Sequence, residues 1–334
     1  MVLRNRLTPA VADVRRAIRV ALEALNLEPN SRILIACSGG PDSMALAAAA
    51  AFEAPKLGLT AAAVIVDHGL QDQSGDVAAS TAEKLEQLGL DPVVVERVVV
   101  EQTGIGLEAA AREARYQALE RARKLLGADL ILLGHNLEDQ AETVLLGLAR
   151  GSGLRSISGM KTFDPGRHLL RPLLGISRET LATSCQDQDI SYWVDPHNSD
   201  DRFTRVRVRK LLGTLESELG PGFAAALSRT AEMAMESDEV VLLAAQKLLA
   251  DSEVSKTENQ IRFAVNSLAD SLPGVRRRAL YEAANSAGAS SVSRIQVLGV
   301  EELITNWHGQ KQLLLSGITV EREGDQLVFT SVAN

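Results

Sequence analysis

The chain has 334 residues, of which 46% are hydrophobic, and its formal net charge at pH 7 is −8. This length favours two domains over one, and the acidic balance argues against nonspecific binding to nucleic acid, although it leaves room for a local basic surface. The longest unbroken apolar run, residues 44–52, is too short to cross a membrane, and charged residues interrupt the first stretch of the chain. We therefore expect a globular protein of the cytoplasm.

Strand-like and helix-like segments alternate over the first half of the chain. We expect strands near residues 31–37, 61–66, 92–100 and 128–134, and helices near residues 8–26, 42–54, 74–89, 105–127 and 136–150. Apolar strands separated by helices predict a parallel sheet with crossover helices, which is an α/β fold. Ligands of such sheets bind beyond the carboxyl ends of the strands.

The second half is less regular and ends in a smaller pattern. We expect helices near residues 177–188, 203–219, 223–252, 274–287 and 292–305, and strands near 261–265, 312–315 and 318–329, the last with a turn at 323–326. The run Gly220-Pro221-Gly222 predicts a hinge. The expected domains are a catalytic α/β domain over 1–220, a linker helix over 221–254 and a small α+β domain over 255–334.

Residues 38–43 read SGGPDS and lie between the first expected strand and a helix-prone run. This order forms a phosphate cradle, because glycine allows close backbone approach and a helix start presents unpaired N–H groups. The P-loop lysine is absent, so Mg²⁺ held by Asp42 is expected to offset the phosphate charge. The expected phosphate-binding residues are Ser38, Gly39, Gly40, Pro41, Asp42 and Ser43. The alternative is an ordinary strand-to-helix connection with Pro41 as the first helical residue.

A second polar segment, residues 135–143, reads HNLEDQAET and follows the fourth expected strand. Helical spacing places His135 and Asp139 on one face, toward the same crevice as SGGPDS. We expect His135 to donate an N–H to the triphosphate and Asp139 to act through Mg²⁺. Helix capping is the alternative, with Asn136 as the N-cap and Asp139 as its partner, and the two roles are compatible.

Two segments are strongly basic. The first contains no acidic residue and comprises Arg202, Arg205, Arg207, Arg209 and Lys210. The second is the run of three arginines at residues 276–278. Each segment fits either a solvated helix face or a contact surface for nucleic-acid phosphates.

Both polar segments resemble motifs of a known superfamily. SGGPDS resembles the SGGxDS motif of the N-type ATP pyrophosphatases, or PP-loop enzymes, which cleave ATP between the α and β phosphates and adenylate a substrate. Residues 135–143 resemble the HTADDQAET motif of the tRNA(Ile)-lysidine synthetases and their tRNA-thiolating relatives, with Asn136, Leu137 and Glu138 where the family usually has Thr, Ala and Asp. The lengthened carboxylate of Glu138 leaves Asp139 as the matching acid.

Further runs resemble the lysidine synthetases in the same order along the chain. They are VDHGL at 66–70, AREARY at 111–116, LARGSG at 148–153, RPLL at 171–174, DPHNS at 195–199 and RVRVR at 205–209. In the last two runs, His197 replaces a serine and Val206 an asparagine of the family pattern. The resemblance covers about residues 31–210, extends to the final domain, and fits the short form of the family.

The resemblance implies a reaction and its cofactors. In the family, ATP adenylates the C2 oxygen of the wobble cytidine in an isoleucine tRNA with a CAU anticodon, and free L-lysine then displaces AMP to form lysidine. For this chain the resemblance implies ATP and Mg²⁺, with Asp42 and Asp139 as metal ligands and His135 beside the phosphates. It also places Asp67 and His68 at the nucleotide.

Other roles follow from the same resemblance. Arg112 or Arg115 is expected to contact phosphate, although each also fits a surface ion pair on an exposed helix. The first basic segment is expected to bind the tRNA backbone, and the domain after residue 230 to help select the tRNA. Glu142 is a candidate for the base that activates lysine. The sequence leaves the oligomeric state open, a homodimer included.

Three other functions were weighed. A thiolating enzyme generally needs cysteines for sulfur or a cluster, and Cys37 lies in an expected strand while Cys185 is isolated. An amide-forming enzyme such as GMP or NAD synthetase is disfavoured, because the later motifs point to tRNA. A non-catalytic tRNA-binding protein is disfavoured by the intact Ser38, Asp42 and Asp139.

Overall fold

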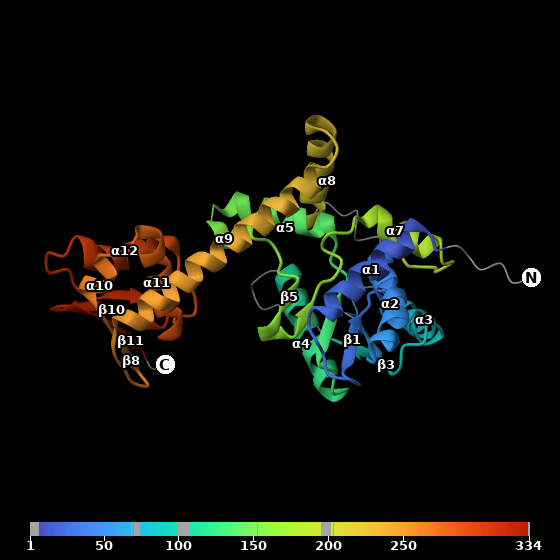
Figure 1. The fold of residues 1–334 in the computed structure, drawn as a ribbon, viewed down its shortest axis with the longest axis horizontal. Coiled ribbons are helices and arrows are strands. Elements are labelled where there is room, and N and C mark those ends of the chain that lie inside the picture. Colours follow the sequence, from blue (N-terminus) through green and yellow to red (C-terminus); the bar gives the residue numbers. More distant parts are fainter. Residues whose placement is uncertain are drawn as a thin grey trace, which may run out of the picture. The chain divides into compact units, whose positions relative to one another are not determined.

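The computed structural model describes residues 7–67, 69, 74–98, 107–151, 153–194, 202 and 204–332 (Figure 1). It divides into two compact units, of which unit 1 comprises Met1–Arg150 and Gly159–Ala231, and unit 2 comprises Gly151–Ser158 and Glu232–Asn334. The domain limits expected at residues 220 and 254 stay a prediction. Among the described residues, no helix is long and apolar enough to cross a membrane.

Unit 1 is built on a six-stranded sheet with the order β3-β2-β1-β4-β6-β5. Its strands are β1 (Arg32–Ala36), β2 (Thr60–Asp67), β3 (Val93–Arg97), β4 (Leu130–Leu133), β5 (Phe163–Asp164) and β6 (Leu169–Leu170). All neighbours pair in parallel except β5 and β6, which are antiparallel. The expected α/β parallel sheet is confirmed, although β5 and β6 were missed because two residues carry no periodic pattern.

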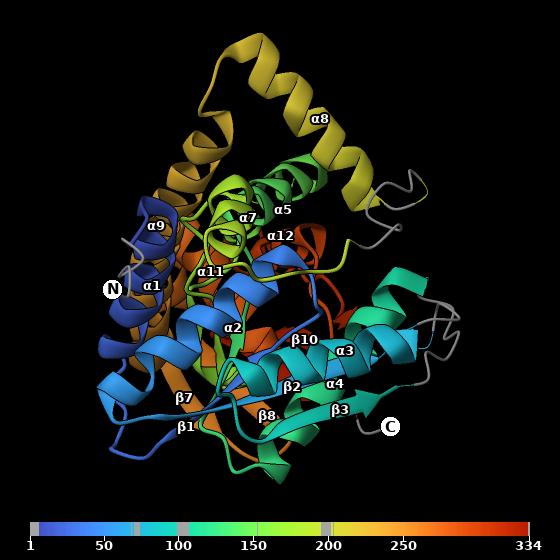
Figure 2. The same cartoon turned by 90° about the vertical axis from the view of Figure 1, so that its right-hand side faces the viewer.

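Helices cover both faces of this sheet, as the alternation of buried side chains along its strands requires. One core cluster contains Ile33 and Ile35 of β1 and packs against the helices α1 (Pro9–Glu23), α2 (Pro41–Glu53), α3 (Ser74–Gln87) and α7 (Arg178–Gln186) (Figure 2). The other contains Leu34 and Ala36 and packs against α4 (Leu107–Leu125). The carboxyl ends of β1 and β4, which are neighbouring strands, therefore open at one edge.

Three helices complete unit 1 beside that edge. They are α5 (Leu137–Arg150), α8 (Thr204–Leu219) and the first part of α9 (Phe223–Ser252), which continues into unit 2. A small apolar cluster joins them and comprises Ala141, Val144, Leu212, Ala224, Leu227 and Ala231. This packing fixes the face that α5 and α8 present to each other.

Unit 2 is a small α+β unit with a five-stranded antiparallel sheet in the order β7-β8-β11-β10-β9. The strands are β7 (Glu253–Lys256), β8 (Gln260–Ala264), β9 (Leu313–Leu315), β10 (Ile318–Glu323) and β11 (Gln326–Ser331), and the helices are α6 (Leu154–Ile157), α10 (Val265–Ala269), α11 (Pro273–Ser286) and α12 (Arg294–Thr305). The small α+β fold expected here is confirmed. The segment expected at 318–329 with a turn at 323–326 is the hairpin of β10 and β11, in which Glu323 pairs with Gln326, so the expected turn is confirmed.

Candidate active site

The turn between β1 and α2 is narrow and depends on glycine. Gly39 has a φ of +81°, and a Cβ at this position would lie 2.7 Å from Thr81 Oγ1. Helix α2 begins at Pro41 after the N-cap Gly40. The turn therefore packs closely against Thr81 of α3, and it ends in the unpaired N–H groups of a helix start, which favour an anion.

The two serines of this turn have different roles in the structure. Ser43 is 7% exposed, and its Oγ accepts from Ser38 N at 3.1 Å and donates to Gly40 O at 3.0 Å. Ser43 therefore holds the turn from inside, while Ser38 is exposed and its Oγ lies 3.3 Å from Ser43 Oγ.

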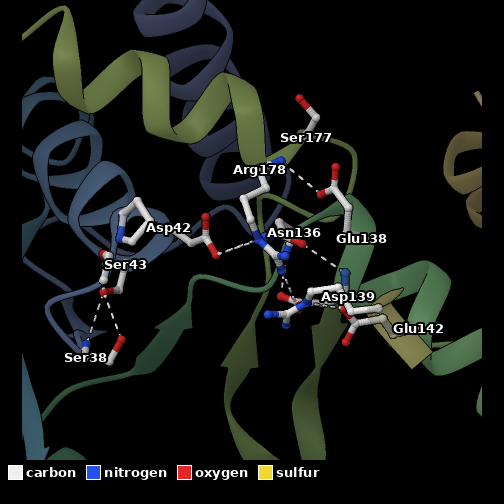
Figure 3. A network of polar contacts seen from close by, with 12 residues as sticks. Ser38, Asp42, Ser43, Asn136, Glu138, Asp139, Glu142, Ser177 and Arg178 are labelled. Carbon is white, nitrogen blue, oxygen red and sulfur yellow. Dashed lines mark hydrogen bonds and ion pairs between the residues drawn. The ribbon is translucent and has the colours of Figure 1, made fainter. Parts of the chain in front are cut away.

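Asp42 lies in the first turn of α2 and is only half satisfied (Figure 3). Its Oδ2 accepts from Asn136 Nδ2 at 3.0 Å, and the same oxygen lies 3.8 Å from Arg178 Nε. Its Oδ1 is buried and has no hydrogen-bond partner. Burial, together with the nearby carboxylates of Asp139 and Glu138, raises the pKa of Asp42 to about 6, against the opposing effect of Arg178. The protein alone thus leaves this carboxylate short of positive partners.

Helix α5 starts with a reciprocal cap. Asn136 Oδ1 accepts from Asp139 N at 2.9 Å, and Asp139 Oδ2 accepts from Asn136 N at 3.1 Å. This is the capping arrangement weighed as an alternative. Because Asn136 also donates to Asp42, the cap of α5 is joined to the start of α2, and Asp139 Oδ1 takes no part in the cap and lies 3.4 Å from Arg178 NH2.

Arg178 completes the centre of the crevice, and sequence analysis missed it. It is the first residue of α7, and its NH2 lies 3.4 Å from Asp139 Oδ1. Its backbone N–H donates to Glu138 Oε2 at 2.9 Å, so the glutamate that departs from the family motif caps a second helix. The only sequence signals for Arg178 were its place four residues after the RPLL run and at the start of the helix expected near residues 177–188.

His135 precedes the cap and is held neutral. Burial, followed by the charges of Arg115, Arg171 and Arg112, keeps the pKa of its imidazole well below the ordinary value. Its Nδ1 is buried without a hydrogen-bond partner. A neutral imidazole among arginines has one N–H to donate and one nitrogen to accept, which agrees with the expected donor role.

The comparisons with known proteins match this geometry. A family model described as "PP-loop domain" matches residues 13–215. A tRNA(Ile)-lysidine synthase of Leifsonia xyli subsp. xyli is 48% identical over 308 residues, which are 91% of each chain. The chain belongs to the tRNA(Ile)-lysidine synthase family.

Two further members of the lysidine synthase family are similar over nearly the whole chain. The Thermobifida fusca protein is 44% identical over 97% of this chain and 98% of its own, and the Streptomyces coelicolor protein is 44% identical over 89% and 84%. A U34-tRNA thiolase from Methanococcus maripaludis has a TM-score of 0.58 over 68% of this chain and 79% of its own, at 20% identity. That likeness shows the fold alone, whereas the identity to the lysidine synthases decides among the enzyme classes weighed above.

In this lysidine synthase family member, the basic segment divides between two sides of α8. Arg209 Nε lies 2.9 Å from Glu142 Oε1, and this carboxylate is 0% exposed. Arg207 is exposed and donates to Arg202 O and to Thr204 Oγ1 at the start of the helix. Arg209, expected to bind tRNA, therefore faces the crevice, while Arg202, Arg207 and Lys210 are exposed and Arg205 is partly buried.

The Glu142 carboxylate has one paired and one unpartnered oxygen. Its Oε2 is buried without a hydrogen-bond partner, although Oε1 is paired with Arg209. Burial raises the pKa of Glu142, and the hydrogen bond and charge of Arg209 oppose that rise. The lysidine synthase thus holds a buried carboxyl with one oxygen free to receive a proton or a cationic group.

The other expected groups come from α4 and from the end of β2. Arg112 is exposed, and its NH2 lies 3.3 Å from Tyr116 Oη, whereas Arg115 is partly buried. Asp67 is 6% exposed at the end of β2, and its Oδ1 accepts from Gly69 N at 2.9 Å. His68 lies outside the described residues. The nucleotide and phosphate roles of these residues stay predictions.

Divalent metal fits the donors that the crevice offers. In the described part of the chain, no group of three or more His, Cys, Asp or Glu residues is placed to hold a metal ion. Mg²⁺ needs fewer, because it is usually bound by one or two carboxylates together with substrate phosphates and water. Asp42 with its unpartnered Oδ1 and Asp139 supply two carboxylates, so the donor set suits an ion that arrives with ATP.

Proposed function

We propose that this chain joins free L-lysine to C2 of the wobble cytidine of isoleucine tRNA with a CAU anticodon, in two steps. In the first step, the C2 oxygen attacks the α-phosphorus of ATP, and the bond to the bridging oxygen breaks, releasing pyrophosphate. In the second step, the ε-amine of lysine attacks C2, the C2–O bond breaks, and the oxygen leaves with AMP. The observation that carries this proposal is the 48% identity to a tRNA(Ile)-lysidine synthase over 91% of both chains.

The first step depends on holding a polyphosphate beside carboxylates. The helix start after Gly40 and the exposed Ser38 hydroxyl supply donors for the phosphates. Asp42 and Asp139, each through Oδ1, would hold Mg²⁺, which when bound neutralises charge on the leaving pyrophosphate. Donors fixed before the reaction need no reorganisation as that charge develops, so the crevice acts mainly by position.

The second step needs an uncharged amine. With a reference pKa of about 10.4, freeing the lysine ε-amine at pH 7 costs roughly 4.6 kcal/mol. Glu142 is suited to anchor the ammonium or to accept its proton, because its buried Oε2 has no partner and burial raises the pKa of this carboxyl. The pair with Arg209 keeps Oε1 in place and leaves Oε2 without a partner in the protein.

The tRNA backbone needs a basic surface, and α8 offers one. Arg207 and Lys210 are exposed in the first turns of this helix, and Arg202 is exposed just before it. Phosphate contacts of this kind give affinity and position the substrate, while the base itself is recognised elsewhere. We assign these three residues, with the partly buried Arg205, to the tRNA backbone.

One assay tests the proposal. The protein is incubated with ATP, Mg²⁺, radiolabelled lysine and an isoleucine tRNA transcript with a CAU anticodon, and both pyrophosphate and lysine bound to tRNA are measured. We expect one lysine bound for each pyrophosphate released, and neither product when uridine replaces the wobble cytidine. Pyrophosphate release without lysine in the tRNA, or equal activity on the uridine transcript, would contradict the proposal.

A further inference from the structure

A guanidinium lies between the two carboxylates that we assign to Mg²⁺. Arg178 Nε is 3.8 Å from Asp42 Oδ2, and its NH2 is 3.4 Å from Asp139 Oδ1 (Figure 3). The two aspartates come from α2 and α5, and the arginine from α7. Three elements far apart in the sequence therefore converge on one small group of charges.

The oxygens of the two aspartates are not equally occupied. Asp42 Oδ2 and Asp139 Oδ2 each accept a hydrogen bond from Asn136, at 3.0 and 3.1 Å. Asp42 Oδ1 has no partner, and the partner of Asp139 Oδ1 is Arg178. The oxygens left for a metal are thus the two Oδ1 atoms, and Arg178 lies against one of them.

The backbone of Arg178 is fixed, while its side chain is not enclosed. Ser177 caps α7, with its Oγ accepting from Thr180 N at 3.2 Å, and Glu138 accepts the Arg178 N–H. The Arg178 side chain is 31% exposed, and both contacts to the aspartates are longer than the 2.9 Å pair of Arg209 with Glu142. The guanidinium can therefore leave Asp139 without any change in the helix.

We propose that Arg178 takes the place of the divalent cation in the nucleotide-free enzyme and withdraws from Asp139 when the metal enters with ATP. This inference rests on the proposed function, which assigns Asp42 and Asp139 to Mg²⁺. Arg178 is then a positioning residue, since it offsets the two carboxylates before substrate binds. Its single charge disfavours binding of a divalent cation alone, so that metal and nucleotide enter together.

The test measures metal binding without nucleotide, using Mn²⁺ as the probe and its electron paramagnetic resonance signal as the readout. We expect Arg178→Gln to bind Mn²⁺ at least about 10-fold more tightly than the parent, because one competing charge has gone. Arg178→Lys keeps the charge and is expected to stay within about 3-fold of the parent. Adding Asp139→Asn to Arg178→Gln should remove the gain, which locates the ion.

Thermal unfolding supplies a second readout that does not depend on activity. Without divalent ions, Arg178→Gln is expected to unfold at a lower temperature than the parent, and Mg²⁺ should raise that temperature more in the variant than in the parent. Equal Mn²⁺ affinity of Arg178→Gln and the parent would overturn the inference, as would a gain that persists with Asp139→Asn. Either result is distinct from failure of the proposed function, which would appear as absence of lysine in tRNA with the parent protein.

Discussion

Both units contain arginines paired with buried carboxylates. The units differ in whether every oxygen of these carboxylates has a hydrogen-bond partner. In unit 2, Glu301 is 6% exposed, and its two oxygens accept from Arg276 Nε at 2.9 Å and Arg277 Nε at 2.7 Å. Arg276 also donates to the carbonyls of Ala269 and Ser271. In unit 1, the crevice leaves Asp42 Oδ1 and other buried polar atoms without partners.

This difference separates a structural charge cluster from a functional one. In the cluster around Glu301, each carboxylate oxygen already accepts a hydrogen bond from an arginine of the same unit, so the charge of this carboxylate is compensated within the protein. The crevice keeps unsatisfied atoms on Asp42, His135 and Glu142, and burial raises the pKa of Asp42 because the charge of Arg178 does not fully compensate it. Perturbed groups and unpartnered polar atoms gathered in one place are typical of binding sites.

The largest expected effect comes from breaking the satisfied cluster. Glu301→Gln removes the carboxylate that two arginines share and leaves Arg276, 7% exposed, as an uncompensated buried charge. We expect a loss of about 3 to 5 kcal/mol in the free energy of unfolding, measured by urea denaturation of the full chain. The neighbouring Glu302→Gln is the control, because Glu302 is exposed and its loss should cost about 0.5 kcal/mol or less. Equal losses in the two variants would refute the comparison.

The next largest effect is expected on catalysis and comes from Asp42, whose Oδ1 has no hydrogen-bond partner. Asp42→Asn keeps the shape of the side chain and removes the charge expected to hold Mg²⁺. Formation of AMP from ATP, measured with tRNA and lysine present, should fall by about 100- to 1,000-fold. Asp76→Asn is the matched control, because Asp76 also lies in the first turn of a helix but is exposed. A variant at position 42 that forms AMP as fast as the parent would remove the basis of the proposed mechanism.

The same substitution should stabilise the nucleotide-free protein in a pH-dependent way. The pKa of Asp42 is raised from 3.8 to about 6 in the folded state, so folding favours the protonated carboxyl and the parent loses stability as the pH rises from about 4 to about 6. Asp42→Asn lacks this loss, so its advantage should grow over that range and level off above it, at up to about 3 kcal/mol. Urea denaturation without divalent ions, at several pH values, checks this. An advantage that shrinks with rising pH would have the wrong sign.

The smallest effect concerns the two basic segments. Replacing Arg202 and Arg207 by alanine should weaken tRNA binding and reduce the slope of log K against log salt by about 1.4 to 1.8, since each phosphate contact contributes about 0.7 to 0.9. Arg278→Ala should leave the slope unchanged, because the Arg278 side chain is only 14% exposed, between Asp238 and Glu282, whereas Arg202 and Arg207 are exposed. Filter binding at several salt concentrations measures both slopes. A larger change with Arg278→Ala would reverse the assignment of the two segments.

Sequence analysis predicted what depends on local pattern and topology. The strands β1 and β4 were expected because they are apolar runs bounded by glycine, and the ends of neighbouring parallel strands meet at one edge. From this rule, the sequence predicts that Asp42 and Asp139, which follow β1 and β4, lie close together. The cap at Asn136 was also expected, since Asn and Asp three residues apart satisfy orphan N–H groups.

The pairings between distant side chains could not be predicted in the same way. Arg178 is 136 positions from Asp42, and no periodicity links a residue of α7 to a residue of α2. Arg209 was grouped with its basic neighbours, because composition does not show which side of α8 faces a buried carboxylate. Contacts of this kind depend on where whole helices pack.

The hydrogen bond from the Arg178 N–H to Glu138 Oε2 limits which sequence segments can be exchanged between this enzyme and its relatives. Aspartate at position 138 would be one methylene shorter and would draw back from the start of α7. Transplanting the relatives' usual motif into this chain would thus loosen a helix that the motif itself does not contain. The donor is the backbone N–H of residue 178, so the side chain at position 138 is coupled to the placement of α7 and not to the residue type at 178, and a successful graft would have to carry the start of α7 together with the motif.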